Sequence, residues 1–425
     1  MLSLYNVVMK VVEKLILWLL NTKLSHWLSS KNKVYKFAKG QEGLVERIRQ
    51  ETCSCKGEIV WIHASSYGEF QVVRPIIGQL KDHGFVILMT FFSPSGYEIM
   101  QNQMMQRARL DFVYYLPWDT KSNAKAFLDA VNPRKAIFVI SEYWLNYLNE
   151  LNRRQIDTFF ISSVIHEDSY LLKWFCKPVR EALKSVTCIM VTDDDSKLCL
   201  GKAGFDNVCV MGDPLFDNAA NVAKTPYTNH TIERFCATSS AVFVVGSISD
   251  KHDLELACSL ANTHRDVKFI MVPHEISEEN INEIKYHLDG RAEIYSDCTE
   301  STNFTNIQTL IIDFIGSLAQ IYRYGQFCYV GGGFTPYLHS VLEPVVYGIS
   351  TSFGPKFRRK IAARQMIKLG IGRNVRTKAE LGKWFVELKN NPKLREEIRQ
   401  KASIYVAAHV GATQKIVSCI IDKSR

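Results

Sequence analysis

The segment Phe327–Gly348, FCYVGGGFTPYLHSVLEPVVYG, carries the clearest fold signal in the chain. Its short apolar run, Phe327–Val330, predicts a buried strand of a parallel sheet, and Gly331, Gly332 and Gly333 follow it directly. Glycine tolerates positive φ and close approach of other groups, so the backbone N–H groups of this turn can face a ligand. The pattern predicts a strand that ends in a ligand-facing turn.

The residues after this turn predict a helix. Ser340 and Glu343 have the S-x-x-E spacing of a capping box, and Gly348 marks the expected end of the helix. Pro344 would lie in the first turn, where its missing N–H is tolerated. A strand, a glycine turn and a helix N-terminus together form an anion-binding site. The alternative is a tight turn that binds nothing.

The first half of the chain alternates short apolar strands with amphipathic helices. Gly84 and Gly204 are placed as helix ends. This rhythm predicts right-handed βαβ units and a parallel, doubly wound sheet. The expected strands are Ile59–His63, Phe85–Phe91, Phe112–Leu116, Ala136–Ile140, Thr158–Ile161, Cys188–Val191 and Val208–Val210.

A second α/β region follows. The stretch Gly212–Asn229 lacks periodicity and contains Pro214 and Pro226, so it is interpreted as a linker. The strand rhythm then restarts, and from Thr377 onward the pattern is helical and charged. We therefore expect an N-terminal segment (1–40), a first domain (41–222) and a second domain (223–425). The last helices of the chain are expected to cross back onto the first domain. The expected strands are Ala241–Val245, Phe269–Val272, Thr309–Ile312, Phe327–Val330 and Ser350–Phe353.

Length and composition support this division and indicate the class of partner. A chain of 425 residues exceeds the size at which one hydrophobic core keeps growing. The 52 Lys and Arg exceed the 43 Asp and Glu and give a net charge of +9, which favours anionic partners. No zinc-finger spacing or basic stripe with interleaved aromatics is present, which argues against nucleic acid. The 11 scattered cysteines indicate inert thiols in a reducing compartment.

The N-terminal residues 4–20 have helical periodicity. We expect one apolar face and one polar face, and the longest uncharged run, Leu15–Leu20, is too short to cross a bilayer. An interfacial anchor is therefore predicted; a helix packed on the protein core and a signal peptide are the alternatives, although no small-residue cleavage site follows. The expected apolar face is Val7, Val8, Val11, Val12, Leu15 and Leu19; the polar face is Asn6, Lys10, Glu13 and Lys14; and the expected lipid-facing flanks are Trp18, Trp27, Lys23, Lys31, Lys33, Lys36 and Lys39.

Two acidic residues follow predicted strands of the first domain. Glu69 comes after a Ser65–Gly68 turn, and Glu142 follows the strand that ends at Ile140. In parallel sheets, ligands bind at the carboxyl ends of the strands, so both side chains are expected near a ligand. By itself each is also an ordinary helix-start residue.

Five motifs in order along the chain resemble the family of Kdo transferases, which move 3-deoxy-D-manno-octulosonic acid (Kdo) from its CMP conjugate to lipid A precursors. They are WIHASSYGE (61–69), FFSPSGYE (91–98), YLPWD (115–119), SEYWLN (141–146) and the stretch from GGGF through His339, Leu342-Glu343-Pro344 and Gly348 to Phe353-Gly354-Pro355. The family usually has Asn at the position of Ser340, and a basic residue is common where this chain has Leu215.

The resemblance implies the glycosyltransferase B arrangement, in which two Rossmann-like domains face each other across a cleft. It also implies inverting transfer from CMP-Kdo at the cytoplasmic face of the bacterial inner membrane, with Glu69 as general base and Glu142 binding the acceptor or supporting Glu69. The implied donor-binding residues are Ser247, Pro273, His274, Glu275, Gly331, Gly332, Gly333, His339, Ser340 and Glu343, with Glu343 on ribose hydroxyls; the implied acceptor-binding residues are Ser66, Gly68, Ser93, Ser95 and Gly96.

No cofactor and no metal are expected. Asp193-Asp194-Asp195 follows a strand and precedes a predicted helix, so helix capping is favoured over a metal site. His339 has no second histidine at metal-ligand spacing, and a hydrogen-bonding role is favoured. Two alternatives stay open: a glycosyltransferase of the same architecture with another sugar or acceptor, and a non-catalytic nucleotide-binding protein at a membrane.

Overall fold

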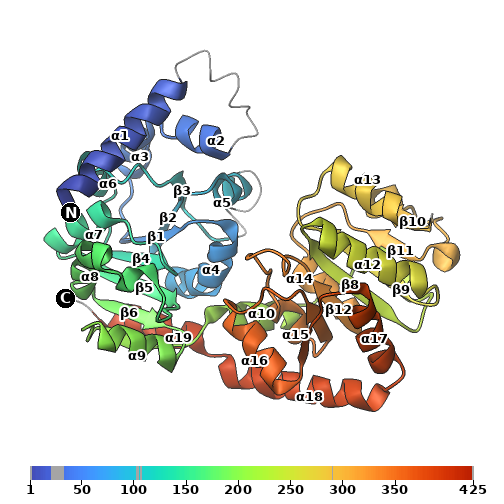
Figure 1. Ribbon diagram of the computed structural model, residues 1–425. Coiled ribbons are helices and arrows are strands. Elements are labelled where there is room, and N and C mark those ends of the chain that lie inside the picture. The colour runs from blue at the N-terminus through green and yellow to red at the C-terminus, as the bar shows by residue number, and fades with distance from the viewer. Residues whose placement is uncertain (1, 21–32, 102–104, 106–107, 290, 424–425) are drawn as a thin grey trace. The chain divides into compact units, whose positions relative to one another are not determined.

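A computed structural model describes residues 2–20, 33–101, 105, 108–289 and 291–423. The chain divides into two compact units, of which the first contains Met1–Asn218 and Val410–Arg425 and the second Ala219–His409. Each unit contains one seven-stranded parallel sheet with helices on both faces (Figure 1). The predicted class, two parallel-sheet α/β domains, is confirmed.

The sheet of the first unit has the order β3-β2-β1-β4-β5-β6-β7. The order reverses between β1 and β4, which pair side by side, and such a switch point is where doubly wound sheets bind ligands. The strands are β1 (Ile59–Ala64), β2 (Val86–Phe91), β3 (Phe112–Tyr115), β4 (Lys135–Val139), β5 (Asp157–Ser163), β6 (Cys188–Val191) and β7 (Val208–Val210). Every strand predicted for this half is present, with small shifts at the ends.

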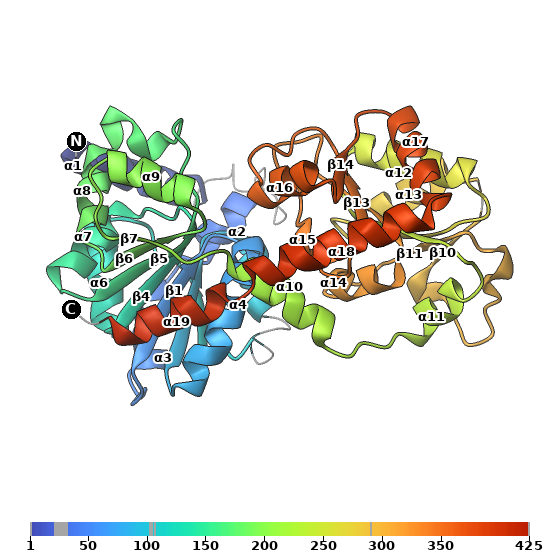
Figure 2. The ribbon, with the colours of Figure 1, turned by 90° about the horizontal axis from the view of Figure 1, so that it is seen from below.

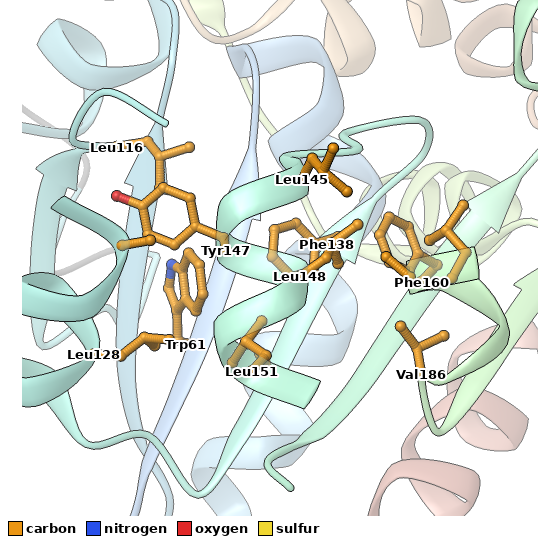
Figure 3. Packing of buried hydrophobic residues seen from close by; sticks show 14 of the residues in the cluster. Trp61, Leu116, Leu128, Phe138, Leu145, Tyr147, Leu148, Leu151, Phe160 and Val186 are labelled. Atoms are coloured by element: carbon orange, nitrogen blue, oxygen red, sulfur yellow. The ribbon is translucent and has the colours of Figure 1, made fainter. Parts of the chain in front are cut away.

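Two hydrophobic clusters, one on each face, hold the helices to this sheet. Figure 3 shows α7 over one face, where Tyr147 and Leu148 pack beside Trp61, Phe138 and Phe160. On the other face, α19 lies along α4, as Figure 2 also shows. The helices are α1 (Leu2–Leu20), α2 (Lys33–Lys39), α3 (Leu44–Thr52), α4 (Tyr67–Asp82), α5 (Pro94–Ile99), α6 (Lys121–Val131), α7 (Leu145–Arg153), α8 (Lys177–Lys184), α9 (Asp194–Lys202) and α19 (Ala412–Asp422).

The second unit repeats the architecture with the order β10-β11-β9-β8-β12-β13-β14. Its strands are β8 (Val242–Ile248), β9 (Lys268–Pro273), β10 (Ala292–Ile294), β11 (Thr309–Ile311), β12 (Phe327–Val330), β13 (Ser350–Phe353) and β14 (Gly372–Asn374). The sequence analysis missed the edge strands β10 and β14. The helices are α11 (His230–Cys236), α12 (Lys251–Thr263), α13 (Glu278–His287), α14 (Leu318–Ile321), α15 (Leu342–Val345), α16 (Ile361–Leu369), α17 (Lys378–Lys389) and α18 (Pro392–His409).

The stretch interpreted as a linker contains the boundary between the two units, but it is largely helical rather than irregular. Helix α10 (Pro214–Lys224) occupies most of it, with Pro214 in the first helical position, where proline is tolerated. Within the first unit, the Asp217 carboxylate of α10 accepts hydrogen bonds from Gly411 N at 2.6 Å, Thr413 N at 2.7 Å and Thr413 Oγ1 at 2.8 Å. These donors lie at the N-terminus of α19, whose N-cap Gly411 has no side chain to cap with.

Helix α1 shows both a packed face and an exposed one. Val12 and Ile16 pack against the core, the Tyr5 hydroxyl donates to Asp119, and the Asn123 amide donates to Glu13 Oε1 at 3.1 Å. The exposed apolar stripe of α1 consists of Val7, Val8, Val11, Leu15 and Trp18. Val12 was predicted on the apolar outer face, and it belongs instead to the packed face.

The basic flank predicted after α1 is only partly described. Lys23, Trp27 and Lys31 lie outside the described residues. Lys36 forms an ion pair with Glu98 at 2.8 Å and Lys39 one with Glu42 at 2.6 Å. Part of the positive charge expected here is therefore paired.

By length and composition, Pro392–Asp422 is the one candidate membrane span among the described residues. This stretch is two helices, α18 and α19, that belong to different units. Ile416, Val417 and Ile420 of α19 are buried in the core of the first unit. That burial accounts for the apolar composition.

We expect Asp217→Ala to release α19. The substitution leaves three donors at the helix start unpaired, and charged acceptors of this kind contribute roughly 1.5–3 kcal/mol each. Amide hydrogen exchange should show lower protection in residues 412–422, with little change in the second unit. Asp206→Ala, which removes an exposed aspartate of the same unit, is the control. Unchanged protection of α19 in Asp217→Ala would show that Asp217 does not hold α19 in place.

Candidate active site

In the first unit, Glu69 lies in the first turn of α4, directly after β1. The Ser66 side chain caps the helix by accepting from Glu69 N, and the Ser65 N–H donates to the Glu69 carboxylate. Burial raises the pKa of Glu69 to about 8, with a further contribution from the charge of Glu142, although hydrogen bonds from the Ser65 and Ser66 backbone oppose the shift. A carboxyl group with this pKa can exchange a proton near neutral pH.

The neighbouring turn after β2 is attached to the Glu69 turn. Ser93 N donates to Ser65 O at 2.7 Å, and the Ser93 hydroxyl accepts from Ser95 N as the cap of α5. Gly96 is buried, and a side chain there would meet the Phe91 ring, with 2.3 Å between the added Cβ and the nearest ring carbon. Of the predicted acceptor-binding residues, Ser66 and Ser93 therefore cap helices and Gly96 makes room for packing. Gly68 is exposed beside Glu69.

Glu142 reaches the same edge of the sheet from β4. The residue at the end of that strand, Ile140, has a φ of 63°, a conformation that β-branched residues rarely adopt. After this bend the Glu142 carboxylate lies 3.3 Å from His63 Nε2 and accepts from Trp144 Nε1 at 2.9 Å. The structure thus brings Glu142 close enough to Glu69 for its charge to raise the pKa of Glu69.

The YLPWD and SEYWLN motifs meet through Asp119. Its buried carboxylate accepts from the backbone N–H groups of Asn146 and Tyr147, at 3.1 and 3.2 Å. Burial raises the pKa of Asp119 to about 6, and hydrogen bonds from Tyr5 and from the backbone oppose that shift. Asp119 therefore fixes the start of α7, next to Glu142.

In the second unit, a buried carboxylate holds the glycine turn. Asp253 of α12 accepts from Gly332 N at 2.8 Å, from Tyr329 Oη at 2.7 Å and from Ser249 N at 3.2 Å. Gly331 N donates to Gly246 O at 2.9 Å. The prediction that all three glycine N–H groups face a ligand is therefore wrong for Gly331 and Gly332. Sequence analysis missed Asp253, because a first-turn acid of α12 resembles an ordinary cap residue.

The glycines are nonetheless required by the space around the turn. Gly332 has a φ of 82°, and a Cβ there would lie 2.4 Å from Tyr337 O. A Cβ on Gly333 would lie 2.4 Å from Gly354 N. Lys356 N donates to Gly333 O at 2.7 Å, so the loop after β13 is tied to the turn.

His339 and His274 lie together beside this turn. Their ring centroids are 4.2 Å apart, and His339 Nε2 lies 2.7 Å from Ser249 Oγ. Burial lowers the pKa of His339 to about 4, and the positive charges of His274 and Lys360 add to the effect. His339 is therefore a neutral hydrogen-bonding group at neutral pH, which agrees with the role favoured from the sequence.

The other predicted donor-site residues lie at the same ends of the strands. Ser247 lies near the end of β8 with a φ of 57°, and its carbonyl accepts from Ser249 Oγ at 2.8 Å. Pro273 ends β9, and Glu275 follows it on the exposed surface. Burial raises the pKa of Glu343 to about 7, and among the described residues Glu343 has no hydrogen-bond partner.

The predicted capping box does not form. Helix α15 has only four residues, its N-cap is Val341 in helical conformation, and no side chain caps it. Ser340 therefore lies outside the helix. Gly348 does end the turn, with a φ of 70° and its N–H donating to Val345 O at 2.9 Å.

The acidic run after β6 caps a helix. Asp193 accepts from Ser196 N at 2.8 Å as the N-cap of α9, which agrees with the interpretation from the sequence. Asp194 and Asp195 lie in the first turn, where acids complement the helix dipole. The described part of the chain contains no group of three or more His, Cys, Asp or Glu side chains placed to hold a metal ion.

Comparison with known proteins finds similarity to Kdo transferases. Residues 37–218 match the family model of 3-deoxy-D-manno-octulosonic-acid transferase. The Kdo transferase of Bordetella pertussis is 24% identical over 85% of this chain and 87% of its own length. That of Aquifex aeolicus is 24% identical over 83% and 93%. These matches agree with the motifs: over residues 37–218 the chain is similar to the Kdo transferases, and most of its length aligns with these relatives.

Solved structures of other proteins share the fold of this chain. A UDP-GlcNAc 2-epimerase from Neisseria meningitidis has a TM-score of 0.62 at 13% identity, covering 86% of this chain and 100% of the other. MurG from Acinetobacter baumannii has a TM-score of 0.54 at 12% identity, with coverage of 86% and 100%. At these identities the likeness concerns the fold alone.

We expect Ser340→Ala to change the free energy of unfolding by less than about 0.5 kcal/mol, because Ser340 caps no helix. Thr377→Ala is the comparison, since Thr377 accepts from Glu380 N at 3.2 Å as the N-cap of α17, a contact worth about 1 kcal/mol. Urea denaturation measures both. If Ser340→Ala lowers the free energy of unfolding as much as Thr377→Ala does, Ser340 caps a helix and the predicted capping box is present.

Proposed function

We propose that this protein transfers Kdo from CMP-Kdo to a lipid A precursor, with inversion and without a divalent metal. The observation that carries the proposal is Glu69, whose carboxyl group has a pKa of about 8 and lies beside Glu142 at the switch point of the first sheet. Transfer of a sugar to a hydroxyl group needs a base that takes the hydroxyl proton.

In the proposed reaction, the unprotonated Glu69 carboxylate takes the proton of an acceptor hydroxyl as that oxygen attacks the anomeric carbon of Kdo. The new C–O bond forms while the bond from that carbon to the CMP phosphate oxygen breaks, and CMP leaves with the bonding electrons. Attack opposite the leaving group inverts the configuration. Glu142 binds the acceptor or supports Glu69, and Ser95 and Gly68 are exposed on the first unit.

In the proposed donor site, CMP-Kdo binds at the ends of β8, β9 and β12. Glu343 accepts from the ribose hydroxyls, which suits a carboxyl group that has no hydrogen-bond partner among the described residues. The backbone N–H of Gly333, the residue Ser340 and the neutral ring of His339 offer hydrogen bonds to the phosphate. Lys360, whose charge reaches His339, supplies the positive charge that a metal ion would otherwise provide.

The direct test incubates the purified protein with CMP-Kdo and lipid IVA in EDTA and weighs the lipid by mass spectrometry. We expect the mass of at least one Kdo to be added. Activity that EDTA abolishes and magnesium restores would refute the metal-independent mechanism. A product formed only from another nucleotide sugar would favour the alternative glycosyltransferase.

We expect Glu69→Gln to lower turnover by about 10²–10⁴-fold while CMP binding is kept, because an amide cannot take the proton. In the wild type, turnover should rise with pH through about 8, since the base acts only when unprotonated. Glu142→Gln removes a negative charge that raises this pKa, so the midpoint should move to lower pH. A Glu69→Gln variant with more than half of wild-type turnover would eliminate Glu69 as the base.

We further propose that the exposed stripe of α1 lies in the cytoplasmic face of an anionic membrane without crossing it. Val11 and Leu15 are 57% and 53% exposed, and Trp18 continues the stripe. Apolar side chains aligned on one helix face, with an interfacial Trp, are typical of monotopic anchors. The packed face of α1 belongs to the fold, so deleting residues 1–22 would disturb the core as well.

The sharper test is Val11→Asp together with Leu15→Asp. These changes leave Tyr5, Val12 and Ile16 in place, so the melting temperature should stay near that of the wild type. Binding to anionic vesicles should fall strongly, and alkaline carbonate should strip the unaltered protein from membranes. Ile404→Asp, at a 70% exposed position of α18, is the control and should bind vesicles normally. Carbonate-resistant wild type would mean that the segment inserts deeply.

A further inference from the structure

A buried chain of polar side chains leads from the core of the first unit to Glu142. Trp61 and His63 of β1 point to the same face of the sheet, and Thr90 lies opposite His63 in the parallel register with β2. Trp61, His63 and Thr90 are all fully buried. Such groups must satisfy one another, so their hydrogens can be assigned.

The assignment begins at Trp61, whose indole N–H can only donate. It lies 2.8 Å from Thr90 Oγ1, which therefore accepts. The single hydroxyl proton of Thr90 can go to His63 Nδ1 at 2.9 Å or to Ile62 O at 3.5 Å. The shorter contact takes the proton, because a 3.5 Å hydrogen bond is weak. His63 Nδ1 is then an acceptor, and the ring proton lies on Nε2.

The other side of the ring agrees with this assignment. With the proton on Nε2, His63 donates to Glu142 Oε2 at 3.3 Å, and Trp144 Nε1 donates to the same oxygen at 2.9 Å. Trp144 Nε1 also lies 2.9 Å from His63 Nε2, so with the ring proton on Nδ1 its N–H would be shared between that nitrogen and Glu142. That tautomer would turn the lone pair of Nε2 toward the Glu142 carboxylate at 3.3 Å and leave Thr90 to donate to Ile62 O at 3.5 Å. The Nε2–H tautomer avoids both, because it gives the carboxylate two N–H donors and uses the shorter contact of Thr90.

We propose that His63 is a positioning residue, a neutral Nε2–H imidazole that Trp61 and Thr90 orient and that holds the Glu142 carboxylate beside Glu69. The strained backbone at Ile140 turns the chain so that Glu142 meets this donor. Because Glu142 has a side-chain exposure of 16% against 0% for His63, the chain runs from a closed core to a carboxylate that substrate can reach. The catalytic meaning of this arrangement rests on the proposed function, whereas the tautomer does not.

The test compares Thr90→Val with Thr90→Ser. Valine keeps the shape but removes the hydroxyl, and serine keeps the hydroxyl. In ¹⁵N-histidine-labelled protein, long-range ¹H–¹⁵N spectra should show a protonated Nε2 and an unprotonated Nδ1 for His63 in the wild type and in Thr90→Ser. Thr90→Val should lose this fixed tautomer, and its kcat should fall by about 10–100-fold, as misplaced groups typically cause. Thr90→Ser should stay within about twofold.

A second pair avoids reliance on Thr90→Val folding. His63→Gln places an N–H donor near the position of Nε2 and should keep more activity than His63→Leu, which offers none. A protonated Nδ1 in the wild type, or equal kcat in Thr90→Val and Thr90→Ser, would overturn the proposal. If the wild type transfers no Kdo, the proposed function fails, and the nitrogen shifts of the wild type and the Thr90 pair still decide the tautomer.

Discussion

The desolvation of Glu69 beside a second carboxylate is the constraint on which the rest of the first unit depends. Both groups cannot carry a full charge there without cost, and burial together with Glu142 raises the pKa of Glu69 to about 8. The folded pKa of Glu69 lies above its ordinary value of 4.5, so proton binding to Glu69 favours the folded state. That contribution to the free energy of unfolding is fully present below the ordinary value and is lost as the pH rises through about 8. The fold must supply that stability elsewhere, and the two hydrophobic clusters of the first unit are where it does so.

In each unit, a buried aspartate accepts hydrogen bonds from backbone N–H groups near the candidate site. Asp119 accepts from two backbone N–H groups and fixes the start of α7. Asp253 accepts from Gly332 N and Ser249 N and fixes the glycine turn after β12. In each case a carboxylate behind the site sets the backbone of the loop in front of it. The loop residues then keep little conformational freedom of their own.

Elements with strong local signals could be predicted from the sequence, and those that depend on distant partners could not. Buried strands such as β12, a short apolar run followed by glycines, were found. The edge strands β10 and β14 have three residues each and are partly exposed, so they show no apolar run. Helix α10 was included in a predicted linker because Pro214 and Pro226 lie in that stretch, yet Pro214 begins the helix and Asp217 faces a partner almost 200 residues away. The Ser340 cap failed because Val341 takes the capping position.

The same distinction applies within the motifs. Family resemblance marked WIHASSYGE as one block, but spacing along the chain could not separate Glu69, in the first turn of α4, from Trp61 and His63, which are fully buried in β1. That separation follows from the period of two along β1 and from the register that sets Thr90 opposite His63. A motif residue that is fully buried and hydrogen-bonded to another motif is thereby constrained as tightly as one that touches substrate, because moving it moves Glu142. The polar residues of a strand ending at such a site are best assigned by the hydrogen bonds they can complete.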